Sequence, residues 1–156
     1  MAASGALAPR KEENVLIPGR GNKPADVLIP NWTKGLDTAL DVTVVNSLRS
    51  DYVDQEAASP GYALVQAHKR KMAAIGEACK EQGIEFVPIP VEVLGGWSKE
   101  ASRHISRLSR ASAARSGKDD KEAQGHLFQK LGVLLQRGNA ALLLNRAPNP
   151  TIHSNI

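Results

Sequence analysis

Short runs of apolar and β-branched residues fill the first third of the chain, and helical spacing dominates the rest. Residues 14–18, 23–30 and 40–45 have the length and composition of strands and are bounded by Pro, Gly or Asn. They predict a meander of three strands. The polar break at residues 31–35 ends in Gly35, which tolerates a positive φ, so we expect a hairpin between the second and third strands.

Residues 46–60 are polar and have no period, which predicts a loop. Apolar positions then recur about every 3.6 residues over residues 62–82, which predicts a long helix, and Gly83 is placed to end it. Residues 84–94 form an almost continuous apolar run. This run predicts a central strand with an irregular beginning, because its two prolines cannot donate to a hydrogen-bond ladder.

Two more helices are predicted in the last third of the chain. Ser98 has the residue type of an N-cap for a helix that carries apolar residues on one side. After a polar linker, leucines at helical spacing predict a last helix over residues 122–137, which Gly138 would end. Residues 140–144 fit either a short strand or another helical turn. The whole order predicts an α/β (α+β) fold with a mixed sheet of about four strands, flanking helices and two additional C-terminal helices.

A chain of 156 residues is long enough for one domain with a core. We expect that domain at residues 14–147, between a helical turn or tail at residues 1–13 and a flexible tail at residues 148–156. No apolar run approaches the ~18 residues of a membrane span, and the N-terminus does not resemble a signal peptide. The single cysteine, Cys79, excludes an internal disulfide and a cysteine-rich zinc site, and it favours a reducing, intracellular setting.

The net charge of +4 is modest, so the distribution of charge is more informative than its sum. Residues 99–115 hold five Lys or Arg and one acid. The cations Lys99, Arg103, Arg107 and Arg110 fall on one side of the predicted helix, opposite its apolar residues. Such a row is typical of a solvated surface and also of a surface that binds phosphates.

Two aspartates lie inside the apolar runs of neighbouring predicted strands, Asp26 in the second and Asp41 in the third. A carboxylate in such a run is costly unless it is paired or binds a metal. On paired strands the two side chains can meet and share a divalent cation. The alternative is that both are ordinary turn-forming residues at strand ends.

Six short segments carry a resemblance to a known family. They are residues 8–12, Pro-Ala-Asp at 24–26, Leu-Asp-Val-Thr-Val at 40–44, residues 66–71, residues 83–88 and residues 91–96. In this order the chain resembles the PD-(D/E)XK nucleases. More closely, it is similar to the restriction-like endonuclease domain of non-LTR retrotransposon reverse transcriptases and related mobile-element proteins. The likeness extends over residues 8–147, nearly the whole chain.

The resemblance implies a restriction-endonuclease-like core in which Asp26 and Asp41 hold Mg²⁺ or Mn²⁺ and a lysine assists the attacking water. The family most often has this lysine two residues after the second acid, where this chain has Thr43. In the retrotransposon domains the following helix supplies the lysine. Lys71 matches that position, and Lys69 is the second choice.

Further expectations follow from the same resemblance. Glu12 and Glu92 match acidic positions that could support the site. The residues expected to bind DNA are Lys69, Arg70, Lys99, Arg103, Arg107 and Arg110. The implied function is a magnesium-dependent endonuclease that nicks target DNA for retrotransposon integration by target-primed reverse transcription. Its partners would be DNA and a reverse transcriptase polypeptide with its RNA, in the nucleus if the host is a eukaryote. The alternative is an inactive DNA-binding or structural module derived from a mobile element.

Overall fold

The computed structural model describes residues 9–11, 17 and 25–146, and these form a mixed sheet between two layers of helices. The sheet has the strand order β1-β2-β3-β4, with a short β1 (Arg10–Lys11) and three long strands, β2 (Val27–Thr33), β3 (Leu36–Val45) and β4 (Ile84–Glu92). The pairs β1–β2 and β2–β3 are antiparallel, whereas β3–β4 is parallel. The prediction of a mixed α/β fold is confirmed.

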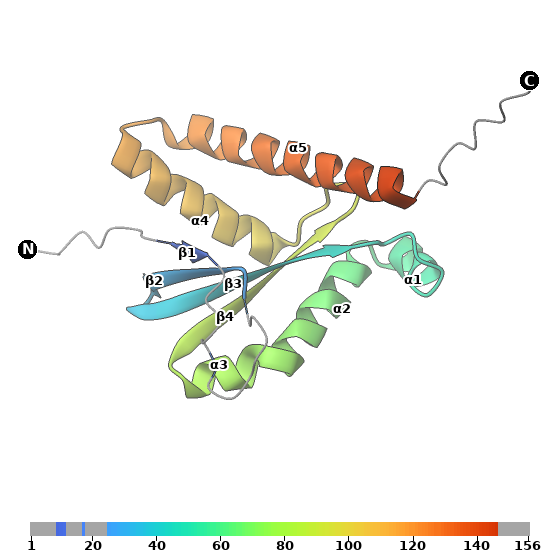
Figure 1. Ribbon diagram of the computed structural model, residues 1–156, viewed down its shortest axis with the longest axis horizontal. Coiled ribbons are helices and arrows are strands. Elements are labelled where there is room, and N and C mark those ends of the chain that lie inside the picture. The colour runs from blue at the N-terminus through green and yellow to red at the C-terminus, as the bar shows by residue number, and fades with distance from the viewer. Residues whose placement is uncertain (1–8, 12–16, 18–24, 147–156) are drawn as a thin grey trace, which may run out of the picture.

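The helices divide between the two faces of the sheet (Figure 1). One side holds α1 (Val53–Ala58), α2 (Tyr62–Lys71) and α3 (Glu77–Glu81), and the other holds α4 (Lys99–Ser116) and α5 (Asp120–Arg146). Successive side chains along each strand point to opposite faces of the sheet, so each face has its own hydrophobic core. Leu28 and Ala39 pack toward α3, whereas Ile29 and Leu40 pack toward α4. The two predicted additional C-terminal helices are therefore confirmed as α4 and α5.

The predicted hairpin between the two aspartate strands is also confirmed. Lys34 and Gly35 form its turn, and both have positive φ values, 51° and 79°. The pairing sets Val27 opposite Leu40 and Leu28 opposite Ala39. Because each pair shares a face, this register directs the apolar side chains of both strands into the same two cores.

The prediction that residues 84–94 form a central strand is wrong, because β4 lies at the edge of the sheet. Its pairing with β3 runs without a break from Ile84 to Glu92. Pro88 and Pro90 are two residues apart, so both nitrogens point away from β3 toward the open edge, where no N–H is required. An edge position thus accommodates two prolines that an internal strand would not.

Two other predictions need correction. Residues 46–60 are not all loop, since α1 forms within them. The last helix does not end at Gly138 but continues to Arg146, so of the two alternatives for residues 140–144 the helical one is present. A glycine inside a helix costs only about 1 kcal/mol, and the alanines and leucines that follow are strong helix formers. The amide of Asn139 donates to the carbonyl oxygen of Val93 (2.7 Å) and so joins α5 to the end of β4.

The N-terminal predictions are only partly open to comparison. Arg10 and Lys11 were expected in a helical turn or tail, but they pair with β2 as a strand because its outer edge is available to them. Of the strand predicted at residues 14–18, only Ile17 is described, and it is buried in the core beside α3. The rest of that strand, Glu12 and the tail at residues 148–156 lie outside the described residues.

The long helix predicted at residues 62–82 is confirmed with one irregularity. A π-helical turn, η1 (Met72–Gly76), joins α2 to α3, and Gly83 follows with a φ of 68°. Lys71 and Cys79 are eight residues apart and both face the sheet, although an α-helix would turn the second about 80° away from the first. The wider π turn absorbs one residue and thereby aligns the two.

Deletion of Ala73, an exposed residue of η1, should therefore give a regular α-helix that keeps Lys71 and Cys79 on one face. We expect the thermal midpoint, followed by circular dichroism, to stay equal or rise. Deletion of the exposed Val65 in α2 is the control, because it rotates Lys71 relative to Leu64. That deletion should lower the free energy of unfolding by about 2 kcal/mol or more, which corresponds to a thermal midpoint roughly 4–8 °C lower. Equal losses in the two variants would contradict the role given to η1.

Candidate active site

Asp26 and Asp41 lie near each other where β2 pairs with β3. Asp26 directly precedes β2, and Asp41 is in β3, one residue after Leu40, which pairs with Val27. The N–H of Asp26 donates to the carbonyl of Leu40 (3.0 Å), and the N–H of Val42 donates to Asp26 Oδ2 (2.7 Å). These bonds bring the carboxylate of Asp26 to the backbone next to Asp41.

Lys71 reaches this pair from the last residue of α2. Its Nζ lies 2.8 Å from Asp41 Oδ2, and the hydroxyl of Thr43 donates to the same oxygen (3.3 Å). Asp41 is only 8% exposed, whereas Asp26 is exposed. A carboxylate this buried is costly without a partner, so Lys71 and Thr43 together stabilise its charged form.

Each aspartate thus has one oxygen bonded to the chain. Oδ2 of Asp26 accepts from Val42, and Oδ2 of Asp41 accepts from Lys71 and Thr43. Both carboxylates are therefore held in position by the chain.

The two carboxylates of the candidate site suit Mg²⁺ better than Zn²⁺. Within residues 25–146 and the few described before them, no three His, Cys, Asp or Glu side chains converge closely enough to hold a metal. Zinc in a structural site takes four protein ligands rich in nitrogen and sulfur. Mg²⁺ is commonly held by one or two carboxylates and keeps several waters. Asp26 and Asp41 meet that requirement.

The other residues predicted at the site are not brought to it. Lys69 and Arg70 are exposed on the last turn of α2, and Glu12 lies outside the described residues. Glu92 follows Pro88, the residue opposite Asp41, by four positions along β4. That spacing corresponds to about 13 Å, so Glu92 does not reach the aspartate pair.

Glu92 instead faces Glu56 of α1. Glu56 accepts hydrogen bonds from the N–H groups of Gly61 and Ala63 (2.8 Å for Ala63) and so fastens α1 to the start of α2. Partial burial, and then the charge of Glu56 and a hydrogen bond with it, raise the pKa of Glu92 above its ordinary value of 4.5. Glu92 therefore has a structural neighbour rather than a place beside Asp41.

Because its pKa is raised in the folded state, Glu92 lowers stability as the pH rises through that pKa. This penalty is absent at a pH below the ordinary value of 4.5, where Glu92 is protonated in both states. We expect Glu92→Gln to be more stable than wild type at pH 7–8 and equally stable near pH 4, measured by urea unfolding. The exposed Glu81→Gln on α3 is the control, and its stability difference from wild type should not follow this trend. A Glu92→Gln protein that is less stable than wild type at neutral pH would contradict an unfavourable charge on Glu92, caused by its burial and by Glu56.

The predicted basic row on α4 is present, with one residue engaged elsewhere. The hydroxyl of Ser98 accepts from the N–H of Ala101 (3.0 Å), which confirms the predicted N-cap. The guanidinium of Arg107 lies 4.3 Å from the ring centroid of Trp32 and donates to that residue's carbonyl oxygen. Arg107 thus joins α4 to β2, while the other three members are exposed, namely Lys99, Arg103 and Arg110.

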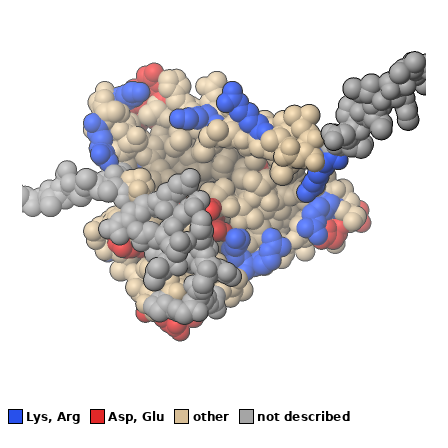
Figure 2. Space-filling model, viewed as in Figure 1, with Lys and Arg blue, Asp and Glu red and all other residues tan. Residues whose placement is uncertain are grey.

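Positive charge is concentrated on the two C-terminal helices and the turn between them. Residues 99–146 contain ten Lys or Arg and four Asp or Glu, a net charge of +6, whereas the whole chain has +4. Figure 2 shows Lys and Arg distributed over these upper helices and again along the lower part of the same face. This distribution favours contact with a polyanion.

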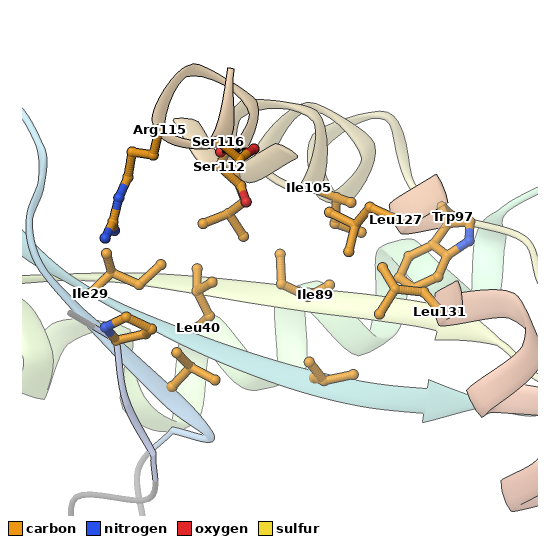
Figure 3. Close-up of a pocket in the computed structure, with 14 residues that line it drawn as sticks. Ile29, Leu40, Ile89, Trp97, Ile105, Ser112, Arg115, Ser116, Leu127 and Leu131 are labelled. Carbon is orange, nitrogen blue, oxygen red and sulfur yellow. Dashed lines mark hydrogen bonds between the residues drawn. The ribbon is translucent and has the colours of Figure 1, made fainter. Parts of the chain in front are cut away.

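A large apolar cavity of about 720 Å³ lies between the sheet and the helices α4 and α5 (Figure 3). Ile29, Leu40 and Ile89 form its floor, and the polar residues Ser112, Arg115 and Ser116 gather at one end. The cavity is on the α4 side of the sheet, whereas Asp41 faces α2. It contributes no carboxylate to the candidate site.

No protein family, curated protein or solved structure matches this chain. None of the described helices is long and apolar enough to cross a membrane. The geometry around Asp26, Asp41 and Lys71 is therefore the starting point for a functional proposal.

Sequence reasoning assigned no role to Thr43, which stands where the family most often has a lysine. It also assigned none to Glu56, whose segment has no hydrophobic periodicity. Strand alternation would have found Thr43, since a residue two positions after Asp41 faces the same side. Nothing local identifies Glu56. Its function depends on the approach of α1 to the beginning of α2, which is a tertiary contact.

Proposed function

We propose that this protein is a magnesium-dependent DNA endonuclease of the restriction-like kind that its sequence resembles. The observation that carries the proposal is the Lys71–Asp41 contact of 2.8 Å beside Asp26. These three residues come from three separate segments of the chain. Asp26 at the start of β2 and Asp41 in the antiparallel neighbour β3, with the lysine on the next long helix, support a restriction-endonuclease-like core.

Each residue has a separate role in this proposal. Asp26 and Asp41 would hold Mg²⁺ or Mn²⁺, which when bound would supply Lewis-acid activation of the phosphodiester and of an attacking water. The N–H of Val42 keeps Asp26 in place. Lys71 orients Asp41, and its ammonium offsets negative charge that develops on the phosphate. Thr43 supports the same carboxylate.

The charge distribution supports DNA as the substrate. Lys69 and Arg70 are exposed beside Lys71, and the hairpin of α4 and α5 carries a net charge of +6 at residues 99–146. In the family that the sequence resembles, the nicked strand primes reverse transcription. We therefore infer a nick in target DNA, with a reverse transcriptase polypeptide and its RNA as further partners.

The catalytic prediction concerns the relaxation of supercoiled plasmid. Wild type should nick it in Mg²⁺ but not in EDTA, whereas Asp26→Asn and Asp41→Asn should abolish nicking and keep or increase DNA affinity, because each removes a negative charge. Lys71→Ala should slow nicking by roughly 10²- to 10³-fold, as expected for loss of one electrostatic donor. Asp37→Asn is the matched control, since Asp37 accepts from the N–H of Asn31 (2.9 Å), away from the site.

Two outcomes would decide against this assignment. If Asp26→Asn and Asp41→Asn nick as fast as wild type, the active site lies elsewhere. If wild type binds DNA but never nicks it in Mg²⁺ or Mn²⁺, the inactive DNA-binding module replaces the enzyme.

The binding prediction concerns the basic row on α4. Replacing Lys99, Arg103 and Arg110 with Ala should weaken duplex binding and reduce the slope of log K against log salt by up to about three, roughly one per phosphate contact. The variants Lys34→Asn, Arg49→Gln and Lys80→Gln, at exposed positions outside residues 99–146, remove the same charge and should leave the slope closer to that of wild type. Fluorescence anisotropy over a series of salt concentrations provides the measurement. Equal slopes in the two triple variants would mean that the row is only a solvated surface.

A further inference from the structure

A second cavity, of about 240 Å³, opens at the outer edge of β4 between α2 and α4. Its lining is of mixed chemistry. The apolar lining residues are Met72, Phe86, Val87 and Pro88. The polar ones are His68, Glu85, Glu100, Arg103 and His104. The cavity exists because β4 is an edge strand, so that the two helices flank an edge that no further described strand covers.

Two buried polar atoms in this cavity have no hydrogen-bond partner within the described part of the chain. They are Oε2 of Glu85 and Nδ1 of His104. Buried polar atoms are nearly always bonded, and each that is not costs free energy. One bridging water would need only a small fraction of the cavity's volume. The cavity therefore has the space and the unmet hydrogen bonds of a binding site.

The side chains define what such a ligand must offer. The carboxylate of Glu85 requires a donor, and burial lowers the pKa of His104, which keeps its imidazole neutral and able to bond through either nitrogen. Arg103 contributes a positive charge to the lining, with Lys99 one turn earlier on α4, and can pair with a phosphate. The apolar lining residues suit a flat ring. A nucleotide has all three features in a single unit: amino donors, a planar base and a phosphate.

The position of the cavity connects it with the proposed active site. His68 comes one helical turn before Lys71, and Met72 directly follows Lys71. Pro88 is paired with Asp41 across β3 and β4. A strand of nucleic acid held at Asp41 and Lys71 would consequently pass within a short distance of the cavity.

We propose that this cavity receives an unpaired nucleobase of the bound DNA strand, with Glu85 accepting a hydrogen bond from its exocyclic amino group. Cytosine fits best, because carboxylates accept from its N4 amino group, whereas thymine has a carbonyl oxygen at that position. The phosphate beside the base is held by Arg103. This inference rests on the proposed DNA substrate, and it adds a base preference that the aspartate pair cannot supply.

The test is fluorescence anisotropy with the labelled single strands (dC)₁₂ and (dT)₁₂ in EDTA, where no cutting occurs. Wild type should bind (dC)₁₂ about tenfold more tightly than (dT)₁₂, the effect of one hydrogen bond to a charged group. Glu85→Met should remove the preference, while Glu81→Met, which removes the same charge from an exposed position on α3, should keep it. Glu85→Met should fold, because the Oε2 atom it removes has no partner within the described chain.

A second variant tests the same cavity from the other helix. His104→Phe occupies the space of the imidazole without its nitrogens, and it should also remove the preference while circular dichroism stays unchanged. Equal binding of both strands by wild type, or a preference that survives Glu85→Met, would overturn the inference. Nicking that persists in that case leaves the proposed function intact. A base preference without nicking in any metal would instead support the cavity and refute the enzyme.

Discussion

The contact between Lys71 and Asp41 is the constraint on which much of the arrangement depends. Asp41 sits inside an apolar strand and is 8% exposed, so its charge requires a cation close by. Here Lys71, on the helix α2 that packs on β3, supplies it. The small residues Ala63 and Ala67 allow α2 to approach the sheet closely enough for the ammonium to reach 2.8 Å. The ion pair therefore depends on the close packing of α2 against the sheet. The π turn η1 continues that packing into α3.

The two faces of the sheet consequently differ in the side chains that cover them. On the α2 face the small side chains of Ala63 and Ala67 pack against Val45, and Asp41 and Lys71 place charged groups near the middle of β3. The α4 face is packed with large aliphatic side chains and leaves a cavity of about 720 Å³ where the helices diverge from the strands. The open edge of β4 lies between them, and there residues from both helical layers share a smaller and more polar cavity. Edge position thus gives the proposed nuclease a second place to contact a substrate.

Sequence reasoning was most successful where a feature depended on nearby residues. The turn at Lys34 and Gly35, the cap at Ser98 and the helical spacing before Gly83 are all local, and each is present. It was wrong where a residue's role depended on a distant partner. Prolines suggested an irregular strand because the sequence does not say which strand is at an edge. Gly138 suggested a helix end because the bond from Asn139 to Val93 cannot be foreseen from the helix alone.

The sequence by itself determined the three long strands and the main helices, the pairing of the two aspartate strands and the choice of Asp26, Asp41 and Lys71 as candidates. Periodicity and turn chemistry act over a few residues, so they can be read without coordinates. Only the tertiary structure decided that Lys71 contacts Asp41, that Arg107 is held by Trp32, and that Glu92 faces Glu56. Distances between side chains from separate segments depend on how helices dock on the sheet. That docking is set by the packing of the whole core, which no single stretch of sequence specifies.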